Sequence, residues 1–275
     1  MPELPEVETV RRRLDAALRG KQWLDVQVLH TDVIRSREDP EVFCQRLAGR
    51  TVQGVARRGK YLVIDLDGER LLCHLRMTGR LMLAGADEAL APHTHLRVAL
   101  ADGRELRFQD TRRFGGFYLI GAKGEGAPAG YRALGPEPLA ADFTADMLGK
   151  QLEGRRTYLK AALLDQATVA GLGNIYVDEA LFRAGLSPTR TSGTLSDTEL
   201  RRLHRAIRAV LREAIEQRGT TFSDYLDSDG APGSYGQSLR VFRRQGEACP
   251  RCGRPLVKSR VAGRGTHYCP HCQEG

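Results

Sequence analysis

The sequence predicts an α+β protein: a leading helix and an antiparallel β-sandwich, followed by a helical region and a terminal β-hairpin. Three observations predict this fold class. Apolar residues repeat with a helical period at the start of the chain, alternate with a period of two as far as about residue 120, and then return to a helical period. A length of 275 residues is enough for one large domain or two modest ones.

The first segment, residues 5–20, has the pattern of a helix. Pro5 is suited to a first helical turn and Gly20 to a C-terminal stop. One face of the segment is apolar and consists of Val7, Val10, Leu14 and Leu18. The sequence therefore predicts a helix at the beginning of the chain.

Short segments with β-type alternation follow. Asp67-Gly68 and Asp102-Gly103 each lie between β-rich segments, which is the strongest short-range signal for a β-hairpin. The expected strands are residues 24–28, 61–66, 70–75, 96–100 and 105–108. Together they predict an antiparallel sandwich over the first half of the chain.

The second half has a helical pattern. Residues 121–138 are rich in Gly, Ala and Pro, which is typical of a linker. Ser196 and Glu199 form a capping box before a long amphipathic helix. The outer face of that helix carries a run typical of a solvated surface: Arg201, Arg202, Arg205, Arg208 and Arg212. We expect an N-terminal domain over 1–121, a linker over 122–141, a helical domain over 142–238 and a terminal hairpin over 239–275.

The charge of the chain favours an anionic partner. Lys and Arg total 42 against 34 Asp and Glu, so the formal net charge is +8. Residues 239–275 hold eight basic and two acidic residues, and residues 50–60 hold four basic residues and no acid. Such localised positive charge favours nucleic acid as the partner.

The sequence argues against two other classes of protein. No apolar run approaches about 18 residues, so a membrane-spanning helix is not expected. Glu3, Glu6 and Glu8 precede the first arginine without an apolar segment, so a signal peptide is not expected either. We therefore expect a cytoplasmic protein.

Four cysteines near the end of the chain have the spacing of a metal site. Cys249, Cys252, Cys269 and Cys272 follow the pattern Cys-x2-Cys-x16-Cys-x2-Cys. Without a signal peptide, this spacing predicts one tetrahedral, structural Zn²⁺ on a β-hairpin and not a disulfide frame. A redox pair is the alternative, but two pairs at this spacing argue against it. His267 and His271 are near enough to replace a ligand, although four thiolates already complete such a site.

The N-terminus has the residues of an amine nucleophile. Removal of Met1 would leave Pro2 with a free secondary amine, and an α-amino group has a pKa near 8, against about 10.4 for lysine. At neutral pH more of it is therefore in the nucleophilic free-base form. Glu3 beside it could donate a proton. Because Met-Pro-Glu is also an ordinary way to begin a helix, this motif alone leaves both interpretations open.

Three further motifs fit nucleic-acid contacts, and each has an ordinary structural alternative. Residues 171–176 (Gly-Leu-Gly-Asn-Ile-Tyr) could present helix N-terminal amides to a phosphate, or form a plain helical corner. Within residues 109–116, Phe114 could insert into a base stack, or belong to a core. Arg264, between glycines at the expected hairpin tip, could bind a phosphate or be solvated.

Taken in their order along the chain, these motifs resemble the bacterial formamidopyrimidine-DNA glycosylase family. The start Pro2-Glu3-Leu4-Pro5-Glu6-Val7-Glu8-Thr9, the segment 171–176 and the four-cysteine hairpin occur in the family's order and spacing. The resemblance covers essentially the whole chain. It implies a helix–two-turn–helix module with a lesion-recognition loop near residues 220–235, and a zinc finger. It also implies a monomeric bacterial DNA-repair enzyme that acts on damaged double-stranded DNA in the nucleoid.

The resemblance further implies an activity and the residues that carry it. The enzyme would flip out and excise 8-oxoguanine and formamidopyrimidines through an imine on Pro2, with Glu3 as proton donor. As an AP lyase in base excision repair, it would then cleave the strand by β,δ-elimination, with Lys60 and Arg264 assisting. The other implied DNA contacts are His74, Met77, His93, Arg112, Arg113, Phe114, Arg155 and Asn174. Met77, Arg112 and Phe114 would fill the vacated stack, with Arg112 facing the orphaned cytosine.

Two other functions fit part of the sequence. Endonuclease VIII, a related glycosylase for oxidised pyrimidines, shares Pro2, Glu3 and the zinc finger, but residues 4–9 and 112–114 favour the purine enzyme. A zinc-ribbon protein that binds DNA without catalysis would explain the charge and the cysteines. It would leave Pro2, Glu3 and Lys60 without a role.

Overall fold

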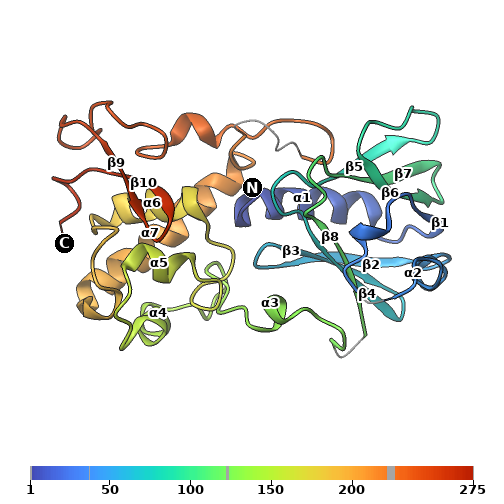
Figure 1. The fold of residues 1–275 in the computed structure, drawn as a ribbon, viewed down its shortest axis with the longest axis horizontal. Helices are drawn as coiled ribbons and strands as arrows, with labels where there is room; N and C mark the ends of the chain where they lie inside the picture. Colours follow the sequence, from blue (N-terminus) through green and yellow to red (C-terminus); the bar gives the residue numbers. More distant parts are fainter. Residues whose placement is uncertain (1, 37, 122–123, 222–226, 275) are drawn as a thin grey trace. The chain divides into compact units, whose positions relative to one another are not determined.

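The chain folds into two compact units in the computed structural model (Figure 1), which describes all residues except 1, 37, 122–123, 222–226 and 275. The first unit comprises Met1–Arg132 and Gln217–Ser234, and the second comprises Ala133–Glu216 and Tyr235–Gly275. The four-part division expected from the sequence stays a prediction, and residues 222–226 of the expected lesion-recognition loop lie outside the described residues. No helix within the described ranges is long and apolar enough to cross a membrane.

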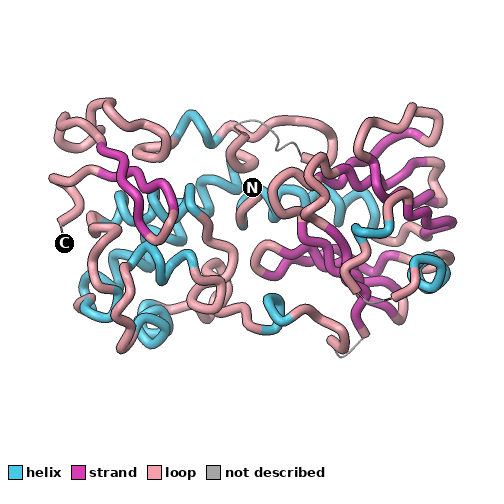
Figure 2. Tube along the Cα trace, viewed as in Figure 1, coloured by secondary structure: helices cyan, strands magenta, loops and turns pink. Residues whose placement is uncertain are grey.

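The first unit contains two antiparallel four-stranded sheets, with orders β1–β6–β7–β5 and β2–β3–β4–β8. Figure 2 shows these strands in magenta. They are β1 (Trp23–Val28), β2 (Val52–Arg58), β3 (Tyr61–Leu66), β4 (Glu69–His74), β5 (Arg80–Gly85), β6 (Thr94–Leu100), β7 (Arg104–Gln109) and β8 (Gly116–Ile120). The helical segments are α1 (Leu4–Leu18), the 3-10 turn η1 (Thr31–Val33), α2 (Pro40–Leu47) and α3 (Ala129–Arg132). The predicted helix and sandwich are therefore confirmed.

The boundaries of α1 follow from its terminal residues. Glu3 is the N-cap and Pro5 lies in the first turn, where a missing N–H costs nothing. The helix ends at Leu18, and Gly20 follows with a φ of +75°. The predicted apolar face is buried, since Val7, Val10, Leu14 and Leu18 are at most 2% exposed.

Asp-Gly turns shape both sheets. Asp67-Gly68 joins β3 to β4, with Leu66 paired to Glu69 and Gly68 at a φ of +83°. Only glycine adopts this left-handed conformation without strain, so the turn fixes the register of the hairpin. The Asp102-Gly103 turn joins β6 to β7 in the other sheet, with Gly103 at +81°.

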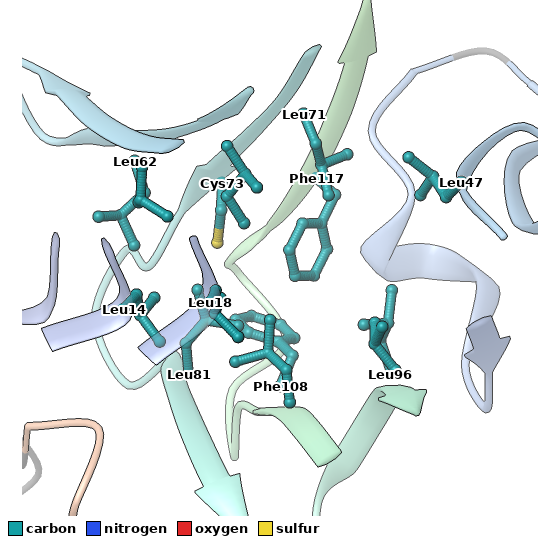
Figure 3. Packing of buried hydrophobic residues seen from close by; sticks show 14 of the residues in the cluster. Leu14, Leu18, Leu47, Leu62, Leu71, Cys73, Leu81, Leu96, Phe108 and Phe117 are labelled. Atoms are coloured by element: carbon teal, nitrogen blue, oxygen red, sulfur yellow. The ribbon is translucent and has the colours of Figure 1, made fainter. Parts of the chain in front are cut away.

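The core of the first unit lies between its two sheets and is closed by α1. Figure 3 shows Leu14 and Leu18 of α1 beside Phe108 of one sheet and Phe117 of the other. The rings of Phe108 and Phe117 meet edge to face, with centroids 5.0 Å apart. This contact ties the two sheets together beneath the loop that joins β7 to β8.

The second unit is helical and ends in a hairpin. Its elements are α4 (Ala145–Leu152), α5 (Leu159–Leu164), α6 (Asn174–Ala184), η2 (Ser192–Thr194), α7 (Asp197–Glu216), η3 (Tyr235–Ser238), β9 (Val257–Val261) and β10 (Arg264–Tyr268). The predicted capping box of α7 is present: Ser196 N–H donates to Glu199 Oε2 at 2.8 Å, and Glu199 N–H donates to Ser196 Oγ at 3.4 Å. In Figure 1 the β9–β10 hairpin lies against α6.

The core packing yields a testable difference between two phenylalanines. Phe108→Ala should lower the free energy of unfolding by about 3–5 kcal/mol, because it removes a fully buried ring and leaves a cavity. Phe114→Ala is the matched control, since Phe114 is 51% exposed and should change stability by about 0.5 kcal/mol or less. Urea unfolding followed by the fluorescence of the single tryptophan, buried Trp23, measures both. Equal losses would contradict this core.

Candidate active site and nucleic-acid interface

The beginning of the chain is buried and held by one carboxylate. Pro2 and Glu3 are both buried, and Glu3 is the N-cap of α1. Glu6, 2% exposed, accepts the backbone N–H of Glu3 through Oε2 at 2.8 Å and that of Thr220 through Oε1 at 2.7 Å. Glu6 thereby fixes the residue next to Pro2 and the segment around Thr220 in one arrangement.

Lys60 and His74 lie at neighbouring strand ends of one sheet. Lys60 occupies a two-residue turn with Gly59, whose φ is +56°, and is 6% exposed. His74 ends β4 and pairs with Tyr61, whose ring it meets edge to face at 4.6 Å. The sequence of the β2–β3 hairpin thus places a lysine next to a buried histidine.

The electrostatics of His74 make it a neutral hydrogen-bond donor. Burial, with the charges of Arg76 and Lys60, lowers the pKa of His74 to about 3. Its Nδ1 accepts the backbone N–H of Arg76 at 3.0 Å, so the ring proton of the neutral form resides on Nε2. At neutral pH the ring can therefore donate from Nε2 to an anionic oxygen without carrying charge.

Two loops that carry exposed apolar side chains are joined through buried Asp110. Met77, 38% exposed, lies on the loop between β4 and β5, and Phe114, 51% exposed, lies on the loop between β7 and β8. Asp110 accepts the Oγ1–H of Thr78 from the first loop. From the second it accepts the N–H of Arg112 at 3.2 Å and of Gly115 at 2.8 Å. One carboxylate therefore sets the geometry of both loops.

Charged side chains complete the β7–β8 loop. The guanidinium of Arg112 lies 4.6 Å from the centre of the Phe114 ring, a cation–π contact. Arg35 holds the backbone of the loop by donating hydrogen bonds to the carbonyls of Arg113 at 2.7 Å and Gly115 at 3.1 Å. Arg113 forms an ion pair with Asp32 at 3.4 Å.

His93 lies next to this loop in a left-handed conformation, with a φ of +64°, and its side chain is exposed. Its carbonyl accepts the N–H of Asp110 at 3.0 Å. The three residues predicted to fill the base stack, Met77, Arg112 and Phe114, are thus on connected loops. His93, a predicted DNA contact, is attached to the same network.

In the second unit a buried ion pair joins α5, α6 and the hairpin. Lys160 and Asp178 are at most 1% exposed, and Lys160 Nζ donates to Asp178 Oδ1 at 2.6 Å. Lys160 also donates to the carbonyl of Gly265 at 3.0 Å, and so does Asn174 Nδ2 at 3.0 Å. The other oxygen of Asp178 accepts the N–H of His267 at 2.9 Å. These bonds hold the strand that begins with Arg264.

Arg264 is exposed next to a tight turn, with Ala262 and Gly263 both at positive φ. Arg155, also in this unit, lies on a loop before α5 and pairs with Asp165 at 3.0 Å. Asn174 is the first residue of α6, and Gly173 is its N-cap. The structure therefore places Asn174 beside the strand of Arg264, whereas Arg155 belongs to a separate ion pair.

The four predicted cysteine ligands converge at the other end of the hairpin. Their sulfurs all lie within 4.8 Å of one another, with Cys249–Cys272 at 3.9 Å and Cys252–Cys269 at 3.6 Å. A tetrahedral ion with Zn–S bonds of about 2.3 Å requires sulfurs about 3.8 Å apart. Backbone N–H groups also point at Cys249 Sγ and Cys269 Sγ, which suits thiolate ligands. The residues fit one structural Zn²⁺.

Sequence reasoning missed the buried carboxylates that organise these segments. Glu6 could have been found, because Glu3 and Glu6 have the spacing of a capping box. Asp178 and Glu179 had a weaker signal, two acids in the apolar part of α6. Asp110 had none, since an aspartate after a strand is ordinary turn chemistry.

The whole chain is similar to curated formamidopyrimidine-DNA glycosylases. It is 50% identical over 273 residues to that of Symbiobacterium thermophilum, covering 99% of this chain and 89% of the relative. It is 46% identical to that of Geobacillus kaustophilus, covering 99% and 100%. Among solved structures, a mutant of the Lactococcus lactis enzyme in complex with a Fapy-dG containing DNA matches with a TM-score of 0.92 and 37% identity, over 100% of both chains.

Family models match in the same order as the structural parts. The formamidopyrimidine-DNA glycosylase N-terminal domain matches residues 1–117, and the H2TH domain of these glycosylases matches residues 134–225. The zinc finger found in this glycosylase and in IleRS matches residues 246–275, which agrees with the sulfur geometry and confirms the predicted zinc site. From these matches and the full-length relatives we conclude that the chain belongs to the formamidopyrimidine-DNA glycosylase family.

Proposed function

We propose that this protein is a bifunctional DNA glycosylase and AP lyase of base excision repair, which removes 8-oxoguanine and formamidopyrimidines from duplex DNA. Membership of the family supports the glycosylase activity. The observation that carries the mechanism is the buried start of α1, where Glu6 fixes Glu3 next to Pro2. We further propose that it acts as a monomer in the bacterial cytoplasm, on the DNA of the nucleoid.

The amine of Pro2 is the proposed nucleophile once Met1 is removed. Its lone pair attacks the sugar C1′, and the damaged base leaves with the electrons of the glycosidic bond and takes up a proton. Glu3 protonates the ring oxygen O4′ as the sugar opens, and C1′ becomes an iminium carbon bonded to Pro2. Because Pro2 is a secondary amine, this iminium is a permanent cation and an effective electron sink.

Elimination then follows from that electron sink. Loss of a proton from C2′ expels the 3′ phosphate, and a second elimination expels the 5′ phosphate, leaving a one-nucleotide gap. We assign Lys60 to this stage because it is a buried cation at a strand end, where its ammonium can bind the phosphate that leaves and stabilise its negative charge. Arg264 is assigned to the flanking phosphates because it is exposed next to a tight turn on a firmly held strand.

Further phosphate contacts are assigned to His74 and Asn174. The neutral His74 ring can donate from Nε2, as its hydrogen bonding and lowered pKa indicate. Asn174 lies at the first turn of α6, where backbone N–H groups favour an anion. His93, Arg113 and Arg155 remain proposed DNA contacts, and the two arginines would have to share or exchange their partners Asp32 and Asp165.

Met77, Arg112 and Phe114 are proposed to fill the space that the flipped nucleotide leaves. An exposed apolar side chain that inserts between bases offsets the lost stacking, and Met77 and Phe114 are both exposed. Arg112 can donate to the cytosine left unpaired. Its cation–π contact with Phe114 holds the two side chains next to each other. The Zn²⁺ would hold Cys249, Cys252, Cys269 and Cys272 together and so keep the hairpin that carries Arg264 rigid.

Retention of Met1 tests the proposed nucleophile without altering any side chain. Protein that retains Met1 should not cleave DNA at 8-oxoguanine, because the Pro2 nitrogen is then an amide. Treatment of the same sample with methionine aminopeptidase should restore cleavage in proportion to the Met1 removed, as read by mass spectrometry. Equal rates before and after treatment would exclude Pro2 as the nucleophile.

The choice of duplex separates the competing functions in the same assay. Cleavage should be fastest with 8-oxoguanine opposite cytosine. Faster cleavage of a thymine-glycol duplex would favour an activity of the endonuclease VIII type. Tight binding without cleavage, by protein that lacks Met1, would favour a zinc-ribbon DNA binder.

Loss of one zinc ligand should impair catalysis through the hairpin. We expect Cys269→Ser to lower the zinc content per chain and to slow strand cleavage by at least about tenfold. Loss of a hydrogen bond that supports a metal ligand already costs about tenfold or more, and loss of the ligand itself should cost at least as much. Cys44→Ser is the matched control, because this half-buried thiol lies outside the cluster. Atomic absorption and single-turnover cleavage measure both effects. Full zinc content in Cys269→Ser would contradict the site.

The Asp110 network predicts a loss of selectivity for the opposite base. Asp110→Asn cannot accept all the hydrogen bonds from Thr78, Arg112 and Gly115. A hydrogen bond to a charged group that is weakened by about 1.4 kcal/mol changes a rate constant by about tenfold. We therefore expect about a tenfold smaller ratio of cleavage rates for 8-oxoguanine opposite cytosine and opposite adenine. Asp102→Asn, before the same strand β7, is the control. An unchanged ratio in Asp110→Asn would exclude this role.

A further inference from the structure

Between Leu200 and Arg212 the outer face of α7 carries arginine and no acid, and the exposed acids Asp197 and Glu216 lie at the two ends of the helix. Residues 200–212 contain five arginines without a single Asp or Glu. Four of these, Arg201, Arg205, Arg208 and Arg212, follow one another at spacings of four, three and four residues, so they form one stripe along the helix. We call this set the α7 arginine stripe. It lies opposite the buried face of the helix, which is formed by Leu203, Ala206, Ile207, Val210, Leu211, Ala214 and Ile215.

The charges of the stripe are not neutralised within the part of the chain that the structure describes. Arg201, Arg205 and Arg212 are exposed and make no ion pair among the described residues. The two half-buried acids of α7 are engaged elsewhere, Glu199 with Arg190 and Glu213 with Arg183.

Arg208 is the fixed member of the stripe. It donates to the backbone carbonyls of Pro138 at 3.0 Å and Ala140 at 2.7 Å, which neutralise no charge. Burial and the nearby charge of Arg212 lower its pKa. Like charges one helical turn apart repel each other, and a bound polyanion would remove that repulsion.

The composition of the stripe favours a nucleic-acid backbone over a protein or a membrane as its binding partner. Protein interfaces have an apolar, often aromatic centre, and a helix that binds a membrane inserts apolar side chains. The large exposed hydrophobic side chains of the described chain all lie outside α7: Leu24, Leu29, Val42, Met77, Leu90, Phe114 and Tyr158. A row of arginines on one helix face, without large exposed apolar side chains beside it, matches a nucleic-acid backbone, which is bound through charge and guanidinium–phosphate hydrogen bonds.

The dimensions of the stripe also fit a duplex. Arg201 and Arg212 are eleven helical steps apart, which corresponds to about 16 Å along the helix axis. One strand of DNA presents a phosphate about every 3.4 Å along its axis, so about five phosphates of a strand lie within this length and can meet the four arginines.

The stripe lies on a different element from the residues already assigned to DNA in this unit. The buried face of α7 packs against α6, and β10 of the hairpin packs against α6 as well (Figure 1). Asn174 and Arg264 belong to α6 and β10. We infer that the α7 arginine stripe is a second DNA-binding surface, which binds the backbone of an undamaged duplex segment irrespective of its sequence.

A second surface changes how the protein moves on DNA. A protein with two independent backbone contacts can hold one segment while it captures another, so it transfers between segments without complete dissociation. The stripe therefore contributes to the search for damage and to retention on long DNA, and it takes no part in chemistry at the lesion.

The test occupies the proposed active site with covalently bound DNA and then measures whether a second duplex binds. Protein trapped by borohydride on a short 8-oxoguanine duplex is purified and titrated with a fluorescent undamaged duplex. We expect salt-sensitive binding of this second duplex. The double variant Arg201→Gln/Arg205→Gln should weaken it and reduce the slope of log affinity against log salt by about 2, since each lost phosphate contact accounts for about 0.9. The yield of trapping should not change.

A matched double variant removes the same charge elsewhere. Arg12 and Arg19 are exposed but paired with Glu8 and Asp15, so Arg12→Gln/Arg19→Gln should bind the second duplex like wild type. Equal weakening in both variants, or none in the stripe variant, would overturn the proposal. Capture of polyglutamate in place of DNA would assign the stripe to an acidic protein instead. If no trapped complex forms, the proposed function fails, and the stripe is then tested by binding of undamaged duplex to the free variants.

Discussion

The position of Glu6 is the constraint on which the proposed chemistry depends. Its carboxylate is almost fully buried and accepts two backbone N–H groups, from Glu3 and from Thr220, which are more than 200 residues apart in sequence. A hydrogen bond to a charged group contributes about 1.5–3 kcal/mol, and the N-terminus of α1 favours a negative charge at this position. Without the bond from Glu3 N–H to Glu6, the residues before α1 would fray like other chain termini, and Pro2 would have no fixed position.

Buried carboxylates that accept backbone N–H groups recur in both units. Asp110 gathers the loops of Met77 and Phe114, and Asp178 binds the strand of Arg264 through His267 N–H. Glu179 accepts the N–H groups of Arg240, Val241 and Phe242, although its burial raises the pKa against the effect of these bonds. A buried carboxylate with backbone donors is costly to leave unsatisfied, so each one specifies a single geometry for the segment that it binds. The buried carboxylates thus hold in one geometry the loops whose side chains we propose as DNA contacts.

Local chemistry explains which parts of the structure the sequence could predict. The Asp67-Gly68 hairpin, the Ser196–Glu199 capping box and the four cysteines depend on neighbours within a few residues or on a fixed spacing. Helix α2 was missed, although Asp39 caps it and Pro40 occupies its first turn, because eight residues are too few to establish a period. The carboxylates could not be predicted as a group, since their donors come from distant segments such as Thr220 and His267.

The most direct measurement of the central claim is the identity of the amino acid that becomes bonded to DNA. Protein without Met1 is reduced with borohydride during its reaction with 8-oxoguanine opposite cytosine, and the adduct is digested and sequenced by mass spectrometry. The account predicts one adduct on the N-terminal peptide, at the nitrogen of Pro2. An adduct on a lysine such as Lys60 or Lys160, or strand cleavage with no adduct at all, would contradict it.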